Sequence, residues 1–427
     1  MSNRGSTYTI KKDDEMLEVA SGPERVLIVG VQTDQYQDQK FMELMKEMHA
    51  LTETAQGQVI KKIVQKMSRL DHRTGVGSGK LQEVKAQVEI ENIDLVIFFN
   101  ALTPSMNRAI EDELGVRVID RVQLILDIFA MRANSREGKL QVSLAQYEYL
   151  LPRIGGKGKS LSRLGGGIGT RGPGETKLES DRRHIRSRIN QIKKELAEVV
   201  AHRERTRLRR QSGREFNIGL VGYTNAGKST LLTELTHSET YVQDQLFATL
   251  DPLTRQLTIK GHPVFTLTDT VGFIEELPTE LIQAFKSTLE EIRYMDLLLH
   301  VVDASNPARD MHEETVLRIL EDMDLKYVPI LTVYNKRDLA NENFVPILKP
   351  NVVISAKNQD DLEVLREAIW KECIQTADYY TVTVSPEESD LLALYQQKTL
   401  VVSMEFDEEG QYYRISGYRR SHHSKED

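Results

Sequence analysis

The chain has 427 residues, a formal net charge of −8 and one cysteine, Cys373. This length predicts two to four domains, and a single cysteine excludes an intrachain disulfide, which fits a reducing cytosol. Apolar stretches reach only about seven to nine residues, too short to span a bilayer, and residues 1–6 do not have the form of a signal peptide. We therefore expect a cytoplasmic protein whose association with membranes is at most peripheral.

Residues 1–20 are polar, and we expect a flexible N-terminus. Residues 21–120 predict an α/β domain, because short apolar runs alternate with segments of helical spacing. The expected order is a strand at 25–31, a helix at 41–52, strands at 59–64 and 93–99, a helix at 103–114 and a strand at 117–119.

A glycine-rich segment within this domain, residues 74–80, partly matches a phosphate-binding loop. However, Thr74 stands at the first glycine position, and Leu81 follows Lys80 where Ser or Thr belongs. Two interpretations stay open: a second nucleotide site, or a glycine turn before a helix.

Residues 121–212 predict a helical hairpin, with helices at 121–132, 139–151 and 175–211 and a loop rich in glycine and basic residues at 153–174. From Arg153 to Arg214 there are 18 Lys/Arg against 6 Asp/Glu, whereas the rest of the chain has 38 against 58. A concentrated basic segment is typical of nucleic-acid binding, and a flexible linker with solvated charges is the alternative. The loop residues expected to bind RNA phosphates are Arg153, Lys157, Lys159, Arg163 and Arg171.

Residues 213–376 contain a phosphate-binding loop of the form G-x-x-x-x-G-K-[ST], between an expected strand at 216–221 and an expected helix. Backbone N–H groups of such a loop cradle phosphates, and Lys228 reaches the β- and γ-phosphates. Further strands are expected near 255–260, 264–268, 297–302, 329–334 and 352–355, with a turn at 261–263 that makes one pair antiparallel. The residues expected to bind phosphate are Gly222, Tyr223, Thr224, Asn225, Ala226, Gly227, Lys228, Ser229, Thr230 and Gly272.

Three oxygen-bearing side chains are expected to hold Mg²⁺ beside the phosphates: Ser229, Thr249 and Asp269. Asp269 begins the segment Asp-Thr-Val-Gly, whose Gly272 can offer its N–H to a γ-phosphate and so sense whether that phosphate is present. Thr249 lies between the phosphate-binding loop and the Asp-Thr-Val-Gly segment, where a mobile threonine would complete the magnesium shell. Thr254 is the alternative.

The segment from Asn335 to Asp338 predicts specificity for guanine. A carboxylate at Asp338 can accept hydrogen bonds from N1–H and the 2-amino group, and adenine lacks both donors. Asn335 can bond the other edge of the base and tie this segment to the phosphate-binding loop, while the N–H of Ala356 can meet the guanine O6. The residues expected to contact guanine are Asn335, Lys336, Asp338, Ser355, Ala356 and Lys357. The motifs together indicate a domain that binds and hydrolyses GTP.

Phe273 occupies the position where Ras-like enzymes carry the glutamine that orients the attacking water. Its ring can neither accept nor donate a proton, and we expect it to pack in the core. Slow intrinsic hydrolysis that a partner accelerates is the consequence.

Residues 377–427 predict a small C-terminal module with strands at 380–384 and 399–406 and a polar end at 419–427. The expected fold class is therefore α/β: a P-loop GTPase domain with an N-terminal α/β domain, a helical hairpin and a small C-terminal α+β module.

Over nearly its whole length the chain resembles the HflX family of bacterial GTPases, within the Obg-like group. The segments that carry the resemblance are 130–142, 165–183, 225–228, 247–252 and 269–273. The resemblance implies a monomer that uses Mg²⁺ and GTP, binds the large ribosomal subunit and its RNA near the peptidyl-transferase region, and splits idle or stalled ribosomes under heat or antibiotic stress. A ribosome-assembly GTPase and a nucleotide-switched RNA-binding module are the alternatives.

Overall fold

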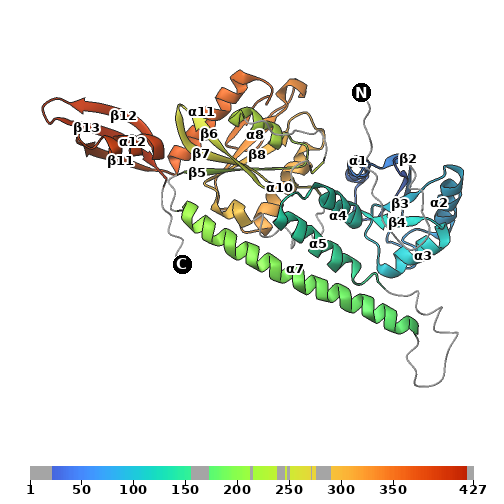
Figure 1. Cartoon of the computed structure of the whole chain (residues 1–427). Helices are drawn as coiled ribbons and strands as arrows, with labels where there is room; N and C mark the ends of the chain where they lie inside the picture. Colours follow the sequence, from blue (N-terminus) through green and yellow to red (C-terminus); the bar gives the residue numbers. More distant parts are fainter. Residues whose placement is uncertain are drawn as a thin grey trace, which may run out of the picture.

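The computed structural model describes residues 22–154, 173–211, 215–237, 246–247, 251–270, 272–275 and 290–420. Three β-sheets follow one another along the chain. Figure 1 shows the 39-residue helix α7 (Pro173–Gln211) running alongside the first two sheets. Among the helices in these ranges, none is both long enough and apolar enough to cross a membrane.

The first sheet is parallel, with the strand order β2-β1-β3-β4. Its elements are β1 (Arg25–Gln32), α1 (Asp38–Thr54), β2 (Gln58–Lys66), α2 (Ser78–Ile90), β3 (Leu95–Phe98), α3 (Pro104–Leu114) and β4 (Arg117–Asp120). Alternate residues of β1 are buried on opposite faces: Val26 and Ile28 lie in the cluster with α1, whereas Leu27 and Val29 lie with α2 and α3. Helices on both faces are what a parallel sheet requires, so the α/β arrangement expected here is confirmed.

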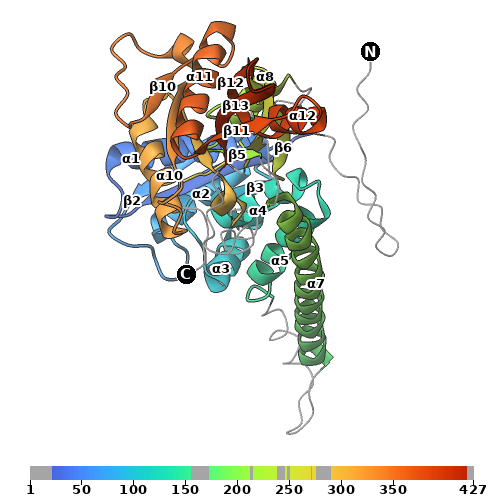
Figure 2. The same ribbon diagram turned by 90° about the vertical axis from the view of Figure 1, so that its left-hand side faces the viewer.

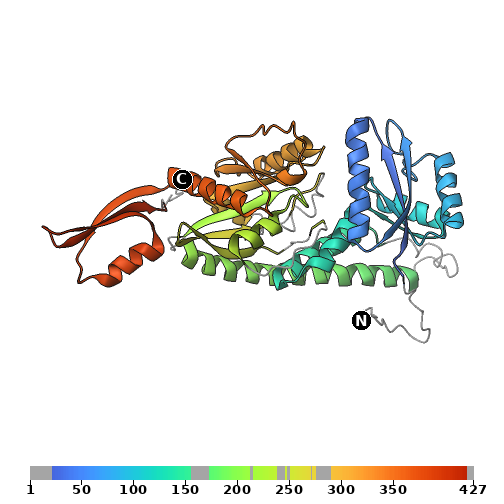
Figure 3. The ribbon, with the colours of Figure 1, turned by 90° about the horizontal axis from the view of Figure 1, so that it is seen from above.

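Three helices follow: α4 (Arg121–Arg132), α5 (Arg136–Leu150) and α7. Asp120 begins α4 by accepting from the N–H of Gln123 at 3.0 Å, and Ser135 begins α5 by accepting from the N–H of Gly138 at 2.9 Å. Helix α7 packs against α5 (Figure 3), and its Ile192 is buried. Figure 2 shows the end of α7 nearest residue 173 projecting beyond the sheets.

The second sheet has the strand order β10-β9-β8-β5-β7-β6, and only β6 and β7 of it pair antiparallel. Its elements are β5 (Phe216–Gly222), α8 (Lys228–Thr236), β6 (Leu253–Ile259), β7 (His262–Asp269), β8 (Leu297–Asp303), α10 (Arg309–Asp322), β9 (Ile330–Asn335), β10 (Asn351–Val353) and α11 (Gln359–Gln375), with short 3-10 helices at Glu290–Tyr294 and Arg337–Leu339. The turn expected at 261–263 is one position earlier, because Lys260 and Gly261 take positive φ values of 51° and 79° and β7 starts at His262.

The C-terminal sheet has three antiparallel strands in the order β11-β13-β12. Its elements are β11 (Asp378–Val384), α12 (Ser389–Lys398), β12 (Leu400–Asp407) and β13 (Tyr412–Arg419). Only two strands were expected, and the one that was missed, β13, is the central strand. Gly417 lies where an added Cβ would come within 2.2 Å of the Leu400 carbonyl oxygen, so the glycine that weakens the strand pattern is required by close strand packing.

Candidate nucleotide-binding site

The phosphate-binding loop joins β5 to α8, as its motif requires. Gly222 has φ 153° and Gly227 has φ 99°. An added Cβ would lie 2.3 Å from the Val301 carbonyl oxygen at the first position and 2.2 Å from Nδ2 of Asn335 at the second. Only glycine fits at these two positions, and the N-terminus of α8 is left facing the space where phosphates would bind.

Lys228, the first residue of α8, is buried. Its ammonium group donates to the carbonyl oxygens of Gly222 at 3.1 Å and Tyr223 at 2.8 Å. Burial lowers the pKa of Lys228 to about 8, although the Asp269 carboxylate raises it. The ammonium group is thus hydrogen-bonded to neutral carbonyl oxygens, and a bound phosphate would add negative charge beside it.

Two of the three residues expected to hold magnesium lie together. The Ser229 hydroxyl donates to the Asp269 carboxylate at 2.7 Å. Hydroxyl and carboxylate oxygens are hard donors, and Mg²⁺ commonly takes only one or two such groups from a protein, with phosphate and water supplying the rest. Thr249 lies outside the described residues, whereas the alternative, Thr254, lies in β6 with its hydroxyl 2.9 Å from that of Thr268.

Gly272 and Phe273 lie directly against the phosphate-binding loop. The Phe273 N–H donates to Gly222 O at 3.1 Å, and the Thr224 N–H donates to Phe273 O at 2.8 Å. A Cβ on Gly272 would come within 3.1 Å of Lys228 Nζ, which places its backbone beside the lysine expected to bind the γ-phosphate. The Phe273 side chain is 1% exposed, so the expectation that it packs in the core is confirmed.

The guanine segment is tied to the phosphate-binding loop through Asn335. Its side-chain amide donates to Ala226 O at 3.0 Å, and its carbonyl accepts from the N–H of Ala356 at 2.9 Å. That N–H, expected to meet guanine O6, is therefore used within the protein in this structure. Lys336 donates to Asn225 O at 2.9 Å, so its stem crosses beside the loop.

Asp338 is exposed at the end of this segment. A hydrogen bond from the Ser355 hydroxyl, more than any other contact, lowers the pKa of the Asp338 carboxyl. The carboxylate is therefore ionised and held near Ser355, which is the state needed to accept two N–H groups of a base. Lys357 is exposed, and Thr230 follows Ser229 in the first turn of α8.

Two acidic residues that support the site were not foreseen from the sequence. Asp303 ends β8 and pairs with Lys336 at 2.7 Å. Asp361 accepts from the N–H of Ser355 at 2.7 Å and pairs with Arg337 at 2.9 Å. A carboxylate at a strand end gave a weak signal for Asp303, but the contacts of Asp361 depend on how α11 packs.

Among the residues expected to bind RNA, only Arg153 lies in the described ranges. Its guanidinium donates to the carbonyl oxygens of Leu102 at 2.8 Å and Tyr149 at 2.9 Å, pairs with Asp120 at 3.4 Å and lies 3.4 Å from the centre of the Tyr149 ring. Arg153 thus joins α5 to the first sheet and does not present its charge to a phosphate. The other four lie outside the described residues.

The glycine-rich segment at 74–80 is engaged within the first α/β region. The N–H of Gly77 donates to Gln65 at 3.0 Å, and the N–H of Gly75 donates to Asp71 O at 3.0 Å. Lys80 pairs with Glu83 at 2.6 Å. Of the two interpretations, these contacts favour a turn before α2 over a phosphate cradle.

Three family models match successive parts of the chain. A GTP-binding GTPase N-terminal model matches residues 42–130, a GTP-binding GTPase middle-region model matches 132–210, and a model described as 50S ribosome-binding GTPase matches 217–336. A crystal structure of a GTP-binding protein from Sulfolobus solfataricus in complex with GDP is similar with a TM-score of 0.43 and 28% identity, over 82% of this chain and 99% of that one.

Curated relatives match almost end to end. GTPase HflX of Alkalihalophilus pseudofirmus is 48% identical over 396 residues, which are 92% of this chain and 93% of the relative. GTPase HflX of Escherichia coli is 39% identical over 394 residues, 91% of this chain and 92% of the relative. With this identity along the chain and a phosphate-binding loop and guanine segment joined in one site, the protein belongs to the HflX family of GTPases.

Proposed function

We propose that this protein hydrolyses GTP slowly on its own, binds the large ribosomal subunit, and splits idle or stalled ribosomes, with hydrolysis stimulated by the ribosome. The observation that carries the nucleotide part is the 3.0 Å contact between Asn335 and Ala226. It supports a single site in which the base segment and the phosphate-binding loop act on one GTP molecule.

In this site Asp338 reads the guanine edge, and Lys228 with the loop N–H groups stabilises charge on the phosphates. Ser229 and Asp269 would hold Mg²⁺ with Thr249 as the third protein group, and the ion when bound neutralises charge on the β- and γ-phosphates. Because the ring of Phe273 is buried and has no polar atom, the group that orients the attacking water must come from elsewhere. This supports slow intrinsic turnover and a role for the ribosome in completing the site.

A basic surface supports the ribosomal partner. Helix α7 carries exposed basic side chains on the described part of its surface, and these are Arg183, Arg186, Arg188, Lys193 and Lys194. Only Lys193 among them has an acidic partner on α5, Glu148 at 2.8 Å. The sequence before α7 adds Lys157, Lys159, Arg163 and Arg171, and this concentration of basic residues suits the phosphates of ribosomal RNA. The family model described as 50S ribosome-binding GTPase covers residues 217–336 and agrees with this partner.

The cellular role we propose is rescue of ribosomes under heat or antibiotic stress, in the cytoplasm, by a monomer that requires no membrane and associates with one only peripherally. Sucrose-gradient profiles with a non-hydrolysable GTP analogue test the central step. A splitting factor converts intact ribosomes to subunits. Co-migration with immature particles would instead favour a ribosome-assembly GTPase, and an unchanged profile with bound protein would favour a nucleotide-switched RNA-binding module.

A further inference from the structure

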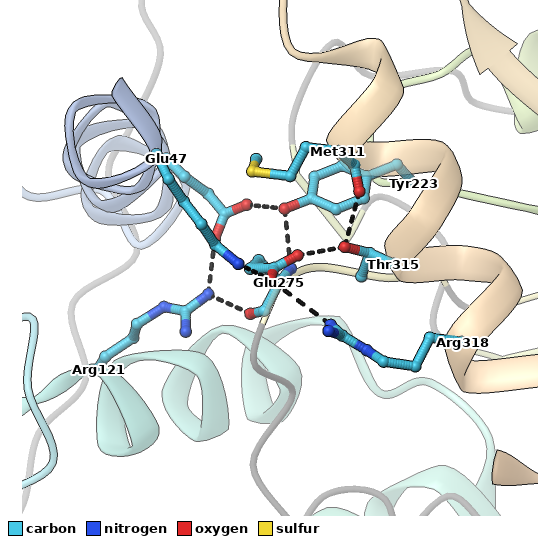
Figure 4. A network of polar contacts seen from close by, with 8 residues as sticks. Glu47, Arg121, Tyr223, Glu275, Met311, Thr315 and Arg318 are labelled. Atoms are coloured by element: carbon cyan, nitrogen blue, oxygen red, sulfur yellow. Dashed lines mark hydrogen bonds and ion pairs between the residues drawn. The ribbon is translucent and has the colours of Figure 1, made fainter. Parts of the chain in front are cut away.

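Glu275 belongs to none of the sequence motifs, yet its buried carboxylate is bonded to side chains from two other elements (Figure 4). It lies three positions after Gly272, and its side chain is 2% exposed. The carboxylate accepts from Lys40 of α1 at 2.7 Å and from the Thr315 hydroxyl of α10, and Arg318 of α10 lies 3.5 Å away. Glu275 therefore connects α1, which packs on the first sheet, to α10, which packs on the second sheet.

The backbone of Glu275 is held as firmly as its side chain. Its N–H donates to the Tyr223 hydroxyl at 2.8 Å, and its carbonyl oxygen accepts from Arg121 at 2.6 Å. Both backbone polar groups of Glu275 are thus bonded to side chains from other elements. Tyr223 comes from the phosphate-binding loop and Arg121 from the first turn of α4.

A fourth residue, Glu47 of α1, closes these contacts into a ring. Its carboxylate accepts from the Tyr223 hydroxyl on one oxygen and from Arg121 at 2.6 Å on the other. Figure 4 shows Glu47, Arg121, Tyr223 and Glu275 meeting between α1, α4 and α10. The Tyr223 ring also stacks on His312 of α10, with centroids 3.7 Å apart and planes 7° from parallel.

The protonation states of Tyr223 and Glu275 agree with the directions of these hydrogen bonds. Burial and the neighbouring Glu47 carboxylate raise the pKa of Tyr223 well above its usual value, so the hydroxyl keeps its proton and donates. Burial raises the pKa of Glu275, but hydrogen bonds from Lys40 and Thr315 and the charges of Lys40 and Arg318 bring that pKa below its usual value. Glu275 is therefore ionised, and its removal would leave Lys40 and Arg318 without this carboxylate partner.

We propose that Glu275 is a positioning residue for GTP hydrolysis, which fixes Gly272 against the phosphate-binding loop, and that the Tyr223–Glu47–Arg121 ring makes this position depend on α1 and α4. The tether from Gly272 to Glu275 is short, and Phe273 within it is already bonded to Gly222 and Thr224. A displaced Glu275 would therefore displace Gly272, and an error of about 1 Å at such a point lowers turnover strongly. This inference rests on the proposed GTPase function.

Single-turnover hydrolysis by full-length Glu275→Ala, Tyr223→Phe and wild-type protein tests the proposal, with Glu321→Gln, an exposed change on α10, as the matched control. We expect the single-turnover rate constant to fall at least about tenfold in Glu275→Ala, while the Kd for GDP, which has no γ-phosphate for Gly272, stays within about twofold. Tyr223→Phe keeps the ring stacked on His312 and removes only the hydroxyl. It therefore tests the hydroxyl contacts in a variant that is expected to fold. Glu275→Gln, which keeps a partner for Thr315, should be intermediate.

A second readout is independent of turnover. Hydrogen exchange in α1 should differ between protein bound to GDP and protein bound to a non-hydrolysable GTP analogue, and Tyr223→Phe should remove that difference. Turnover of Glu275→Ala within about twofold of wild type, or a parallel loss of GDP and GTP affinity, would overturn the positioning role while leaving the GTPase function intact. Absence of hydrolysis in the wild-type protein alone and with ribosomes would instead overturn the proposed function and this inference with it.

Discussion

The side-chain amide of Asn335 donates to the carbonyl oxygen of Ala226 at 3.0 Å, across 109 positions of sequence. Asn335 is 2% exposed and also accepts from the N–H of Ala356. One side chain therefore holds the guanine segment, the phosphate-binding loop and the segment at Ser355 together. Both the N–H₂ group and the carbonyl oxygen of its amide are needed for this.

Asn335→Asp separates the two roles, because a carboxylate keeps the acceptor for Ala356 and loses the donor to Ala226. We expect affinity for both GDP and GTP to fall by about tenfold or more, since a buried acceptor loses its partner at a cost of about 1–3 kcal/mol. Fluorescent GDP titration measures this. Equal GDP affinity in Asn335→Asp and wild type would show that the loops hold their places without this contact.

Asp338→Asn tests which group reads the base. Guanine offers two N–H donors to the carboxylate, whereas an amide in that place suits xanthine, whose 2-position carbonyl can accept from it. The variant should lose GTP affinity and prefer xanthosine triphosphate, in competition binding with both nucleotides. A variant that still strongly prefers GTP would show that Asp338 does not select the base.

Lys228→Ala and Ser229→Ala should abolish measurable hydrolysis, because each removes a group expected at the phosphates or the metal. Phe273→Ala should keep basal turnover within roughly tenfold, about 1.4 kcal/mol, since its buried ring lies in the core. It should also destabilise the fold by about 3–5 kcal/mol, as expected for emptying a buried aromatic site. A much larger loss of turnover with intact GTP affinity would mean that the ring helps to order the catalytic water.

The sequence was informative where chemistry constrains residue type locally. Gly222 and Gly227 are required by close backbone approach, and the spacing to Lys228 follows from a strand–loop–helix turn, so that part of the site could be read directly. Tyr223 could be placed in the loop by the same motif, but its hydroxyl meets Glu47, which is 176 positions away. Such a contact depends on how two sheets dock and leaves no local pattern.

Arg153 is a residue whose contacts could not be predicted from the composition of the chain. Its charge and its place beside a glycine-rich basic loop predicted a phosphate contact, yet it is bonded to Leu102, Tyr149 and Asp120. Composition could locate the basic segment but could not tell which arginine is used inside the protein. In β13, likewise, Gly417 and exposed polar residues lowered the strand signal, although neighbouring strands on both sides determine its conformation.

Replacing residues 155–167 with a neutral Gly-Ser linker tests the RNA role of the basic loop. The change removes Lys157, Lys159 and Arg163 and leaves the nucleotide site intact. We expect GTP affinity near wild type, a sharp loss of ribosome-stimulated hydrolysis and subunit splitting, and a log–log salt slope for ribosome binding reduced by about two units. Unchanged splitting with an unchanged slope would mean that the loop is only a spacer.

Stability should fall in mild acid because of His300, which lies on β8 beside the phosphate-binding loop and is 1% exposed. It lines a cavity of about 60 Å³ together with Tyr223, Asp303 and His312. Burial, helped by the charge of Lys228, lowers the pKa of His300 to about 4. The unfolded chain, with an ordinary histidine pKa of about 6.5, therefore binds more protons than the folded one between these two values, and stability is lost as pH falls through this window.

His300 alone accounts for a loss on the order of 1 kcal/mol at pH 5.5 relative to pH 7.5, and His300→Gln should remove that part of the acid loss. Urea unfolding at the two pH values, followed by the fluorescence of Trp370, the single tryptophan, which lies on α11 of the same sheet region, measures the difference. His184→Gln on the exposed surface of α7 is the matched control and should behave as wild type. An equal acid loss in His300→Gln and wild type would mean that other groups, His312 among them, account for the pH dependence.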